Sequence, residues 1–290
     1  MEEKQVFLLY AETQVHAGTG FETGVVDLPI QRERTTKFPV IQGIKGALRA
    51  YFRVNSKDKG KEIEIFGSDP ESGEETKPGN LNFSEAKILL FPVRNPDKLF
   101  VWVTCPLVLV RFAKAVDEEE VIKEIEERAK IDYDKCLPLF DARKVYLEEI
   151  KLEAVDIDLP KTRRLIAKIS RCAPIDYLKN KIKSDVVIVN DTLFSEIVQS
   201  MTEVVPRIRI NRETKTVEEG GLWYEEYLPQ DTVMYFVVRK SYYNNMKDSL
   251  METFKSTVHG NLVNIGGKET VGKGMVWIYA WGDEDGDSQS

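Results

Sequence analysis

Histidine and cysteine are scarce in this sequence, and long hydrophobic runs are lacking. Among 290 residues there are two histidines and three cysteines. Cys105, Cys136 and Cys172 lie far apart and form no CxxC pair, which argues against a zinc knuckle and a disulfide framework. No apolar run approaches the ~20 residues of a membrane helix, and the acidic start leads directly into a strand pattern. We therefore expect a cytoplasmic protein without a signal peptide.

Positive charge is in the minority, but it is clustered. The chain has 48 acidic and 41 basic residues, a net charge of −7, which taken alone counts against a nucleic-acid partner. Residues 31–53 nevertheless hold six basic residues and one acidic, and residues 160–183 hold eight and one. Charge separated in this way can form a basic groove on an acidic body.

The length and the polar stretches suggest how the chain is organised. A chain of 290 residues can bury a sizeable core, and we predict a single domain over residues 1–290. Residues 56–80 are rich in Gly, Pro, Lys and Glu around a short apolar island, which predicts an insertion outside the core. The acidic tail 283–290 is expected to be disordered.

A glycine-containing loop follows the first predicted strand, residues 5–10. In the loop His16-Ala-Gly-Thr-Gly, the glycines Gly18 and Gly20 allow the backbone to approach a ligand closely. No GxGxxG motif is completed, so a nucleotide cofactor is a weak interpretation. His16 is either a titrating catalytic group or a residue that contacts a ligand.

A single acid, Asp27, stands among apolar residues at 25–30. Pro29 disfavours both a helix and a central strand here, so we expect a loop or an edge segment. An aspartate in such a place is either a turn residue or a functional carboxylate, and its position alone favours turn duty.

The clearest helical pattern covers residues 42–52. Its apolar residues recur at helical spacing, and Lys45, Arg49 and Arg53 recur every four residues beside them. Amide groups at the helix start together with Lys45 would hold a phosphate well. The alternative is an ordinary solvated face of a surface helix.

Residues 206–229 are expected to form a long β-hairpin with too little apolar surface to fold alone. At its end, aromatic residues surround two acids, Glu225 and Glu226, followed by Tyr227. Such an alternation suits a site but is also ordinary strand composition.

A second glycine-rich segment, residues 265–274, contains Gly266, Gly267, Lys268 and Lys273. Successive backbone N–H groups and lysines in such a loop can wrap a phosphate. A flexible hairpin loop has the same composition, so the pattern alone is weak evidence.

The remaining patterns predict an α+β fold with a ferredoxin-like, RNA-recognition-type palm, an inserted hairpin thumb and peripheral helical insertions. Helices are expected at 117–130 and 244–257, with a helical turn at 193–198. Strands are expected at 87–93, 99–111, 146–155, 186–189, 232–238 and 276–281.

Several motifs in one order resemble a known family. The HxGxG loop, the KGALR helix, the IFGS island, the FPVR strand and the GGKETVGKG loop resemble the RAMP proteins of CRISPR RNA-targeting complexes. The segments VDLPIQRE, NLNFSEAKILLFPVR and INRETKTVEEGGLWYEEYLP look like the repeated backbone subunit of the type III-B (Cmr) effector. The resemblance covers nearly the whole chain.

This resemblance implies an RNA-guided endoribonuclease that acts within a complex. Copies of the chain would stack in a filament along one crRNA, together with other Cmr subunits. A hairpin thumb from each copy would displace one base of the guide–target duplex. The target RNA would then be cut at regular intervals, by attack of a ribose 2′-OH on the adjacent phosphate.

The resemblance also implies roles for individual residues. Asp27 matches the cutting acid and is the expected ligand of a divalent metal ion, Mg or Mn. His16, Glu225 and Tyr227 match supporting residues, with the choice between Glu225 and Glu226 open. The chain departs from the pattern at Gln42-Gly43-Ile44-Lys45, where relatives commonly have serines before the lysine.

Two other hypotheses remain at the level of the sequence. The chain could be a non-catalytic crRNA-binding subunit, in which case loss of Asp27 would leave cleavage intact. It could also be a stand-alone crRNA-processing nuclease, which would cut repeat RNA without metal and would have no neighbour for a thumb.

Overall fold

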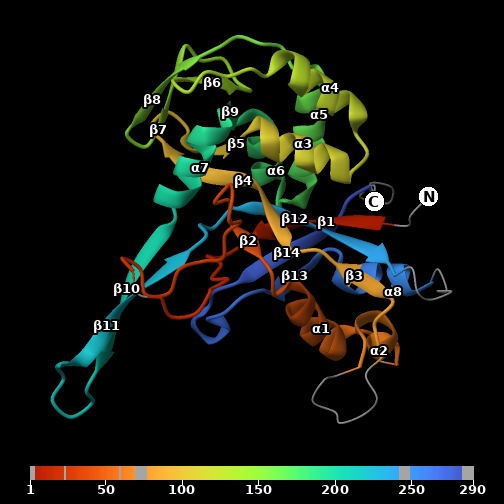
Figure 1. The fold of residues 1–290 in the computed structure, drawn as a ribbon, viewed down its shortest axis with the longest axis vertical. Coiled ribbons are helices and arrows are strands. Elements are labelled where there is room, and N and C mark those ends of the chain that lie inside the picture. Colours follow the sequence, from red (N-terminus) through yellow and green to blue (C-terminus); the bar gives the residue numbers. More distant parts are fainter. Residues whose placement is uncertain (1–3, 23, 59, 69–76, 242–248, 283–290) are drawn as a thin grey trace.

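The computed structural model describes residues 4–22, 24–58, 60–68, 77–241 and 249–282 (Figure 1). One long mixed sheet runs through this part of the chain. Its order is β13 (Asn261–Asn264), β14 (Met275–Ala280), β1 (Lys4–Ala11), β12 (Val233–Lys240), β4 (Ala86–Asn95), β5 (Leu99–Thr104), β9 (Val186–Val189), β6 (Lys135–Pro138), β8 (Ile150–Ala154) and β7 (Lys144–Leu147). The short strands β2 (Val40–Ile41) and β3 (Leu81–Phe83) pair with β4 and β12.

The palm is built around β1, which lies between β12 and β14 and pairs antiparallel with both. The run from Val6 to Ala11 is buried, so this strand reads as a continuous apolar segment rather than an alternating one. Helices α1 (Ile44–Asn55), α2 (Lys61–Phe66) and α8 (Ser249–Val258) pack together beside the sheet (Figure 1). The ring of Phe254 in α8 lies edge-on to that of Phe7 in β1, with centroids 5.4 Å apart.

A second group of helices surrounds the far end of the sheet, at the top of Figure 1. It contains α3 (Pro106–Ala115), α4 (Glu119–Arg128), α5 (Pro160–Ile169), the 3₁₀ turn η1 (Ser170–Cys172), α6 (Asp176–Ser184) and α7 (Asp191–Ser200). The basic run at 160–183 therefore forms α5, η1 and α6. A mixed sheet with helices in these positions confirms the predicted fold class.

Two predicted strands were wrong in extent. The strand expected at 99–111 ends at Thr104, and α3 begins at Pro106. Proline is well placed there, because its missing N–H is not needed in the first helical turn. The strand expected at 146–155 is a pair, β7 and β8, joined by a tight turn in which Glu148 has a φ of 50°.

The predicted insertion at 56–80 includes a packed helix. Within α2, Ile65 and Phe66 are buried, and the ring of Phe66 stacks on Phe83 with centroids 5.2 Å apart. The apolar island in this stretch is thus a part of the core. Residues 69–76 of the insertion and the predicted acidic tail 283–290 lie outside the described residues.

A separate two-stranded sheet projects from the body (Figure 1). Its strands are β10 (Glu203–Ile210) and β11 (Val217–Tyr227), so the hairpin begins slightly before the predicted 206–229. The described ranges include no helix that is long and apolar enough to cross a membrane. The hairpin exposes many apolar side chains, namely Val204, Ile208, Ile210, Val217, Leu222 and Tyr224.

Candidate functional site

The chain after β1 returns twice to the base of the hairpin. Val15 and Leu228 exchange backbone hydrogen bonds of 3.1 and 2.9 Å. Further on, the N–H of Leu28 donates to the carbonyl of Tyr224, and the N–H of Glu226 donates to the carbonyl of Leu28, both at 3.0 Å. Two segments of the long loop between β1 and β2 are therefore joined to the end of the hairpin by isolated β-bridges. This pairing places the loop's histidine and aspartate against the hairpin base.

Asp27 is half-buried at this junction. Its Oδ2 accepts a hydrogen bond of 2.7 Å from the backbone N–H of Tyr224. Its carbonyl oxygen accepts another, of 2.9 Å, from the N–H of Glu22. Within the described ranges, no donor reaches Oδ1. One carboxylate oxygen thus anchors the side chain and the other is available to a ligand, so the catalytic role stays a prediction with compatible geometry.

His16 is 6% exposed and points its Nδ1 at the carbonyl oxygen of Glu226, 2.7 Å away. A carbonyl oxygen can only accept, so Nδ1 carries a proton and donates this hydrogen bond. A Cβ at residue 18 would lie 2.5 Å from the Nε2 of His16. Gly18 is therefore required by the close approach of the imidazole.

Glu225 is 1% exposed, and its carboxylate accepts four hydrogen bonds. Oε1 accepts hydrogen bonds from the indole N–H of Trp223 at 2.8 Å and from Nζ of Lys268 at 2.6 Å. Oε2 receives Nε of Arg207 at 3.1 Å and the hydroxyl of Tyr227. Burial alone would raise the pKa of Glu225, but the four donors outweigh it and lower the pKa from 4.5 to about 2.

Glu226 points to a different set of partners. Its Oε1 accepts from Arg32 at 2.5 Å and from the hydroxyl of Thr202 at 2.7 Å, and its Oε2 accepts from the N–H of Ile30 at 3.0 Å. Of the two neighbouring acids, Glu225 is therefore the one that shares a cluster with Tyr227, and Glu226 anchors the loop that follows Asp27.

Tyr227 is fully buried between this cluster and the glycine-rich loop. Its hydroxyl donates to Glu225 and accepts from Arg207 at 3.2 Å. Burial is the main cause that raises the pKa of Tyr227. The ammonium of Lys273 lies 5.3 Å from the centroid of the Tyr227 ring. The centroid of the His16 imidazole lies 5.4 Å from the same point.

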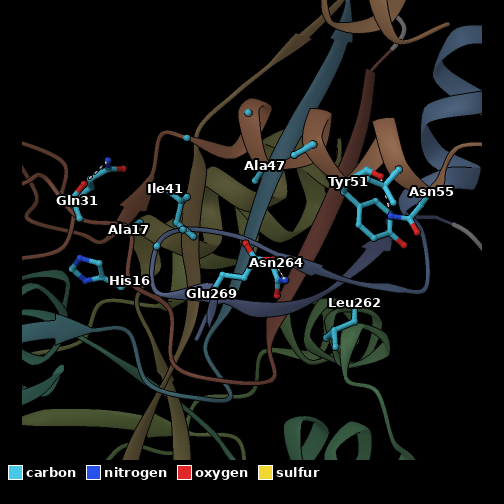
Figure 2. A pocket seen from close by; sticks show the side chains of 17 residues that line it. His16, Ala17, Gln31, Ile41, Ala47, Tyr51, Asn55, Leu262, Asn264 and Glu269 are labelled. Atoms are coloured by element: carbon cyan, nitrogen blue, oxygen red, sulfur yellow. Dashed lines mark hydrogen bonds between the residues drawn. The ribbon is translucent and has the colours of Figure 1, made fainter. Parts of the chain in front are cut away.

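A groove of about 810 Å³ opens beside the cluster, between α1, the loop at 16–18, β13 and the glycine-rich loop (Figure 2). Small residues of α1 form one wall, and side-chain amides from three elements reach the lining. Gly266 has a φ of 92°, and a Cβ there would lie 2.5 Å from the carbonyl oxygen of His16. The lining includes Gly43, Gly46, Ala47, Ala50, Gln31, Asn55 and Asn264.

The predicted RNA-binding residues divide into two groups. Gly18, Gly266 and Gly267 line the groove, whereas Gly20 is exposed with a φ of 104°. Lys268 and Lys273 contact the acid–tyrosine cluster just described. On α1, Lys45 is exposed. Nε of Arg49 and NH2 of Arg53 each lie 2.8 Å from Oε1 of Glu62 in α2. The RNA contacts of all these residues stay predictions.

Sequence reasoning missed three side chains that organise the site, Arg32, Arg207 and Trp223. For Arg207 a signal existed, because basic and acidic residues alternate along the two strands of the predicted hairpin. The register that sets Arg207 opposite Trp223 and diagonal to Glu225 could not be known without the fold. Arg32 carried no signal beyond its charge.

The described residues provide no cage for a resident metal ion. No group of three or more His, Cys, Asp or Glu side chains with the required proximity occurs among them. The oxygens of Glu225 are already occupied, and Asp27 offers one oxygen. A divalent ion prefers about six oxygen ligands. These residues alone do not provide enough ligands to hold such an ion.

Comparison with known proteins identifies the family of this chain. The family model for the RAMP superfamily matches residues 8–277. The chain belongs to the RAMP superfamily. This RAMP protein is 40% identical over 282 residues to the CRISPR system Cmr endoribonuclease Cmr4 of Pyrococcus furiosus, covering 93% of each chain. It is 26% identical to the CRISPR system CMR subunit Cmr4 of Saccharolobus solfataricus, covering 93% of this chain and 94% of that one.

Solved structures agree with the family. The crystal structure of oligomeric Cmr4 from Pyrococcus furiosus matches with a TM-score of 0.72 and 31% identity, over 97% of this chain and 98% of that one. The type III-B Cmr-beta complex bound to cognate target RNA contains a chain of the same fold. That chain matches with a TM-score of 0.75 and 24% identity, over 96% of this chain and 97% of that one. The resemblance stated from the motifs is confirmed.

Proposed function

We propose that this RAMP protein is the repeated backbone subunit of a type III-B effector. It binds crRNA along a filament and cuts complementary target RNA with Asp27. The 40% identity to an endoribonuclease over most of both chains supports the reaction class. The observation that carries the assignment of Asp27 is its placement, with one oxygen held by the Tyr224 amide and no described donor on the other.

The groove supports the binding of an RNA strand. Gly43, Gly46 and Ala47 leave room for a backbone to approach α1 closely, and the amides of Asn55 and Asn264 offer both donors and acceptors. Such groups can contact ribose hydroxyls and base edges, while exposed cations such as Lys45 meet phosphates. We assign the guide strand to this groove.

The cutting step needs a carboxylate or base near the 2′-OH and relief of charge on the phosphate. Asp27 provides the carboxylate, and His16 lies on the groove wall. Tyr227 is fully buried and hydrogen-bonded, so we assign it to holding the cluster. A divalent ion, Mg or Mn, remains part of the proposal; it would take most of its ligands from RNA and water, with Asp27 adding one.

Self-association and other partners follow from the hairpin. A projecting two-stranded arm with six half-exposed apolar side chains is not stable alone and gains from a neighbour. The 31%-identical neighbour is an oligomer. We therefore expect copies of this chain to stack on one crRNA, with the other Cmr subunits at the ends or flanks, in the cytoplasm.

The Asp27→Asn substitution tests the assignment. Asparagine keeps an oxygen for the Tyr224 amide but removes the charge, so the fold should be unaffected. In the reconstituted effector with guide and target RNA, single-turnover cleavage should fall at least ~100-fold. Guide retention should be unchanged. The matched control is Asp141→Asn, which changes an exposed aspartate far along the chain. The effector with this variant should cleave at the wild-type rate.

Cleavage at the wild-type rate by Asp27→Asn would show that Asp27 is not the catalytic acid and would favour a structural, non-catalytic subunit. Cutting of repeat RNA by the chain alone, in the presence of a chelator, would instead show a stand-alone processing nuclease. Loss of cutting in chelator, restored by Mg or Mn, is expected if the metal assignment is right.

A further inference from the structure

The carboxylate of Glu225 has no remaining capacity for chemistry. A carboxylate has about four lone-pair positions, and all are used here: Trp223 and Lys268 on Oε1, Arg207 and Tyr227 on Oε2. To bind a metal or accept a proton, Glu225 would have to give up a charged or buried partner. The low pKa of this group, about 2, agrees with a fully satisfied anion. Its geometry is that of a structural centre.

Lys268 differs from the other donors to this centre. Arg207, Trp223 and Tyr227 all belong to the hairpin strands, whereas Lys268 comes from the glycine-rich loop, 43 residues away from Glu225. Its backbone is in the left-handed region, with a φ of 67°. That conformation is uncommon for a residue with a Cβ, and the surrounding structure must hold it. The 2.6 Å contact to Glu225 is one such restraint.

The loop that carries Lys268 is itself tied to the segment after β1. The N–H of Gly267 donates to the carbonyl of His16, and the N–H of Gly274 donates to the carbonyl of Gln14, both at 2.8 Å. The loop is thus a rigid neighbour of the hairpin base, and Lys268 is its side-chain link to Glu225.

A short path leads from Glu225 to Asp27. The backbone N–H of Tyr224, one residue before Glu225, is the donor that holds Oδ2 of Asp27. The next residue, Leu28, is paired to the same strand segment by the hydrogen bonds to Tyr224 and Glu226. A displacement of residues 224–226 would therefore carry Asp27 with it.

We propose that Lys268 is a positioning residue for Asp27: it clamps the Glu225 carboxylate to the glycine-rich loop, and Glu225 fixes the strand segment whose Tyr224 amide holds Asp27. The importance of this position for cleavage depends on the proposed function, but the clamp itself does not. The competing interpretation is that Lys268 simply neutralises a guide phosphate and that Glu225 takes part in the chemistry.

The first experiment measures hydrogen–deuterium exchange at the Tyr224 amide in the full-length chain without RNA. Lys268→Met and Glu225→Gln should each speed exchange roughly tenfold, because a charged hydrogen bond that restrains the segment is lost. The double variant should match Glu225→Gln alone, because that substitution already weakens the link to Lys268 together with the three other hydrogen bonds of this carboxylate. Lys268→Arg should stay near the wild type, and Lys130→Met, an exposed lysine outside the site, should not differ from it.

Unchanged exchange in Lys268→Met, or additive effects in the double variant, would overturn the clamp. This result does not depend on whether the chain cuts RNA, so it is separate from a failure of Asp27 as the cutting acid.

The second experiment measures single-turnover cleavage and RNA affinity in the assembled effector. Lys268→Met should slow cleavage ~10-fold or more, because a small displacement of the acid is costly, while the affinities for guide and target stay the same. Lys268→Arg should restore most of the rate. Weaker guide retention with an unchanged cleavage rate at saturating RNA would show a phosphate-binding lysine and overturn the positioning role.

Discussion

Glu225 and Asp27 are chemically alike, and the fold gives them opposite environments. Glu225 is buried among four donors, two of them cations, and is held in its ionised form. Asp27 is half-buried, with one oxygen anchored by a backbone amide and no described donor on the other. A carboxylate that is satisfied on every side stabilises a structure, whereas one with an open oxygen can receive a ligand. The role proposed for Asp27 rests on this difference.

The Glu225→Gln substitution should destabilise the protein in a pH-dependent way. The pKa of Glu225 is lowered from 4.5 to about 2, so its ionised form stabilises the fold above the ordinary pKa, and this contribution is lost as the pH falls through the folded-state value. At about pH 7 we expect a loss of about 3 kcal/mol in the free energy of unfolding. Urea denaturation at pH values from about 7 down to about 2 measures this loss.

The difference between wild type and Glu225→Gln should shrink as the pH is lowered from about 4.5 to about 2. Glu126→Gln, an exposed glutamate on α4, is the control and should show a negligible change throughout. A difference that is independent of pH would mean that packing, rather than charge, explains the loss.

At the scale of elements, α1 and α2 show that a basic stripe can serve the fold. Glu62 of α2 receives Arg49 and Arg53 of α1, and the guanidinium of Arg49 also donates to the carbonyl of Gly67 at 3.0 Å. These contacts hold α2 against the helix that forms a groove wall. Periodicity located the helix and its basic residues correctly, but it could not show which of them face another element, because that depends on the packing of α2.

Arg49→Ala should therefore lower the free energy of unfolding by about 2 kcal/mol, since it removes a half-buried ion pair and a backbone hydrogen bond together. The matched change one turn earlier, Lys45→Ala, should stay within about 0.5 kcal/mol of the wild type, because Lys45 is exposed. Thermal and urea unfolding of both variants provide the measurement. Equal stability of the two variants would contradict a bracing role for Arg49.

The element predictions failed where a local pattern suits two structures. An apolar run of strand-like composition from 99 to 111 continues into a helix after Pro106, and because nearly every residue of the run is apolar, its composition shows no clear periodicity. The hairpin was easier, because alternation and polar turn residues are local signals.

At the scale of the whole molecule, an acidic chain carries the groove that is proposed to bind RNA. The net charge is −7, yet the groove walls include small, amide and aromatic residues with one acid, Glu269. The proposed RNA binding would then depend on close contacts in the groove and on a few exposed cations nearby, not on the overall charge. The acidic body lowers non-specific attraction to other nucleic acids.

If only a few exposed cations contact phosphates, the affinity for the guide should depend only weakly on salt, and each such lysine should contribute a measurable part of that dependence. In the assembled effector, Lys45→Met should reduce the slope of log affinity against log salt by roughly 0.7, the loss of one phosphate contact to a single strand. Affinity titrations at several salt concentrations measure the slope. Lys130→Met is the control, and an unchanged slope in Lys45→Met would remove this lysine from the RNA contacts.

The sequence by itself determined the family, the fold class, the hairpin, the two glycine loops and the candidate residues, because these depend on local composition, spacing and motif order. The tertiary structure decided the partners. His16 meets Glu226 across 210 residues, and Lys268 meets Glu225 across 43. No local pattern encodes such contacts, because they arise from strand register and loop packing. These contacts distinguish Glu225, whose carboxylate is fully hydrogen-bonded, from Asp27, which has one carboxylate oxygen without a described donor.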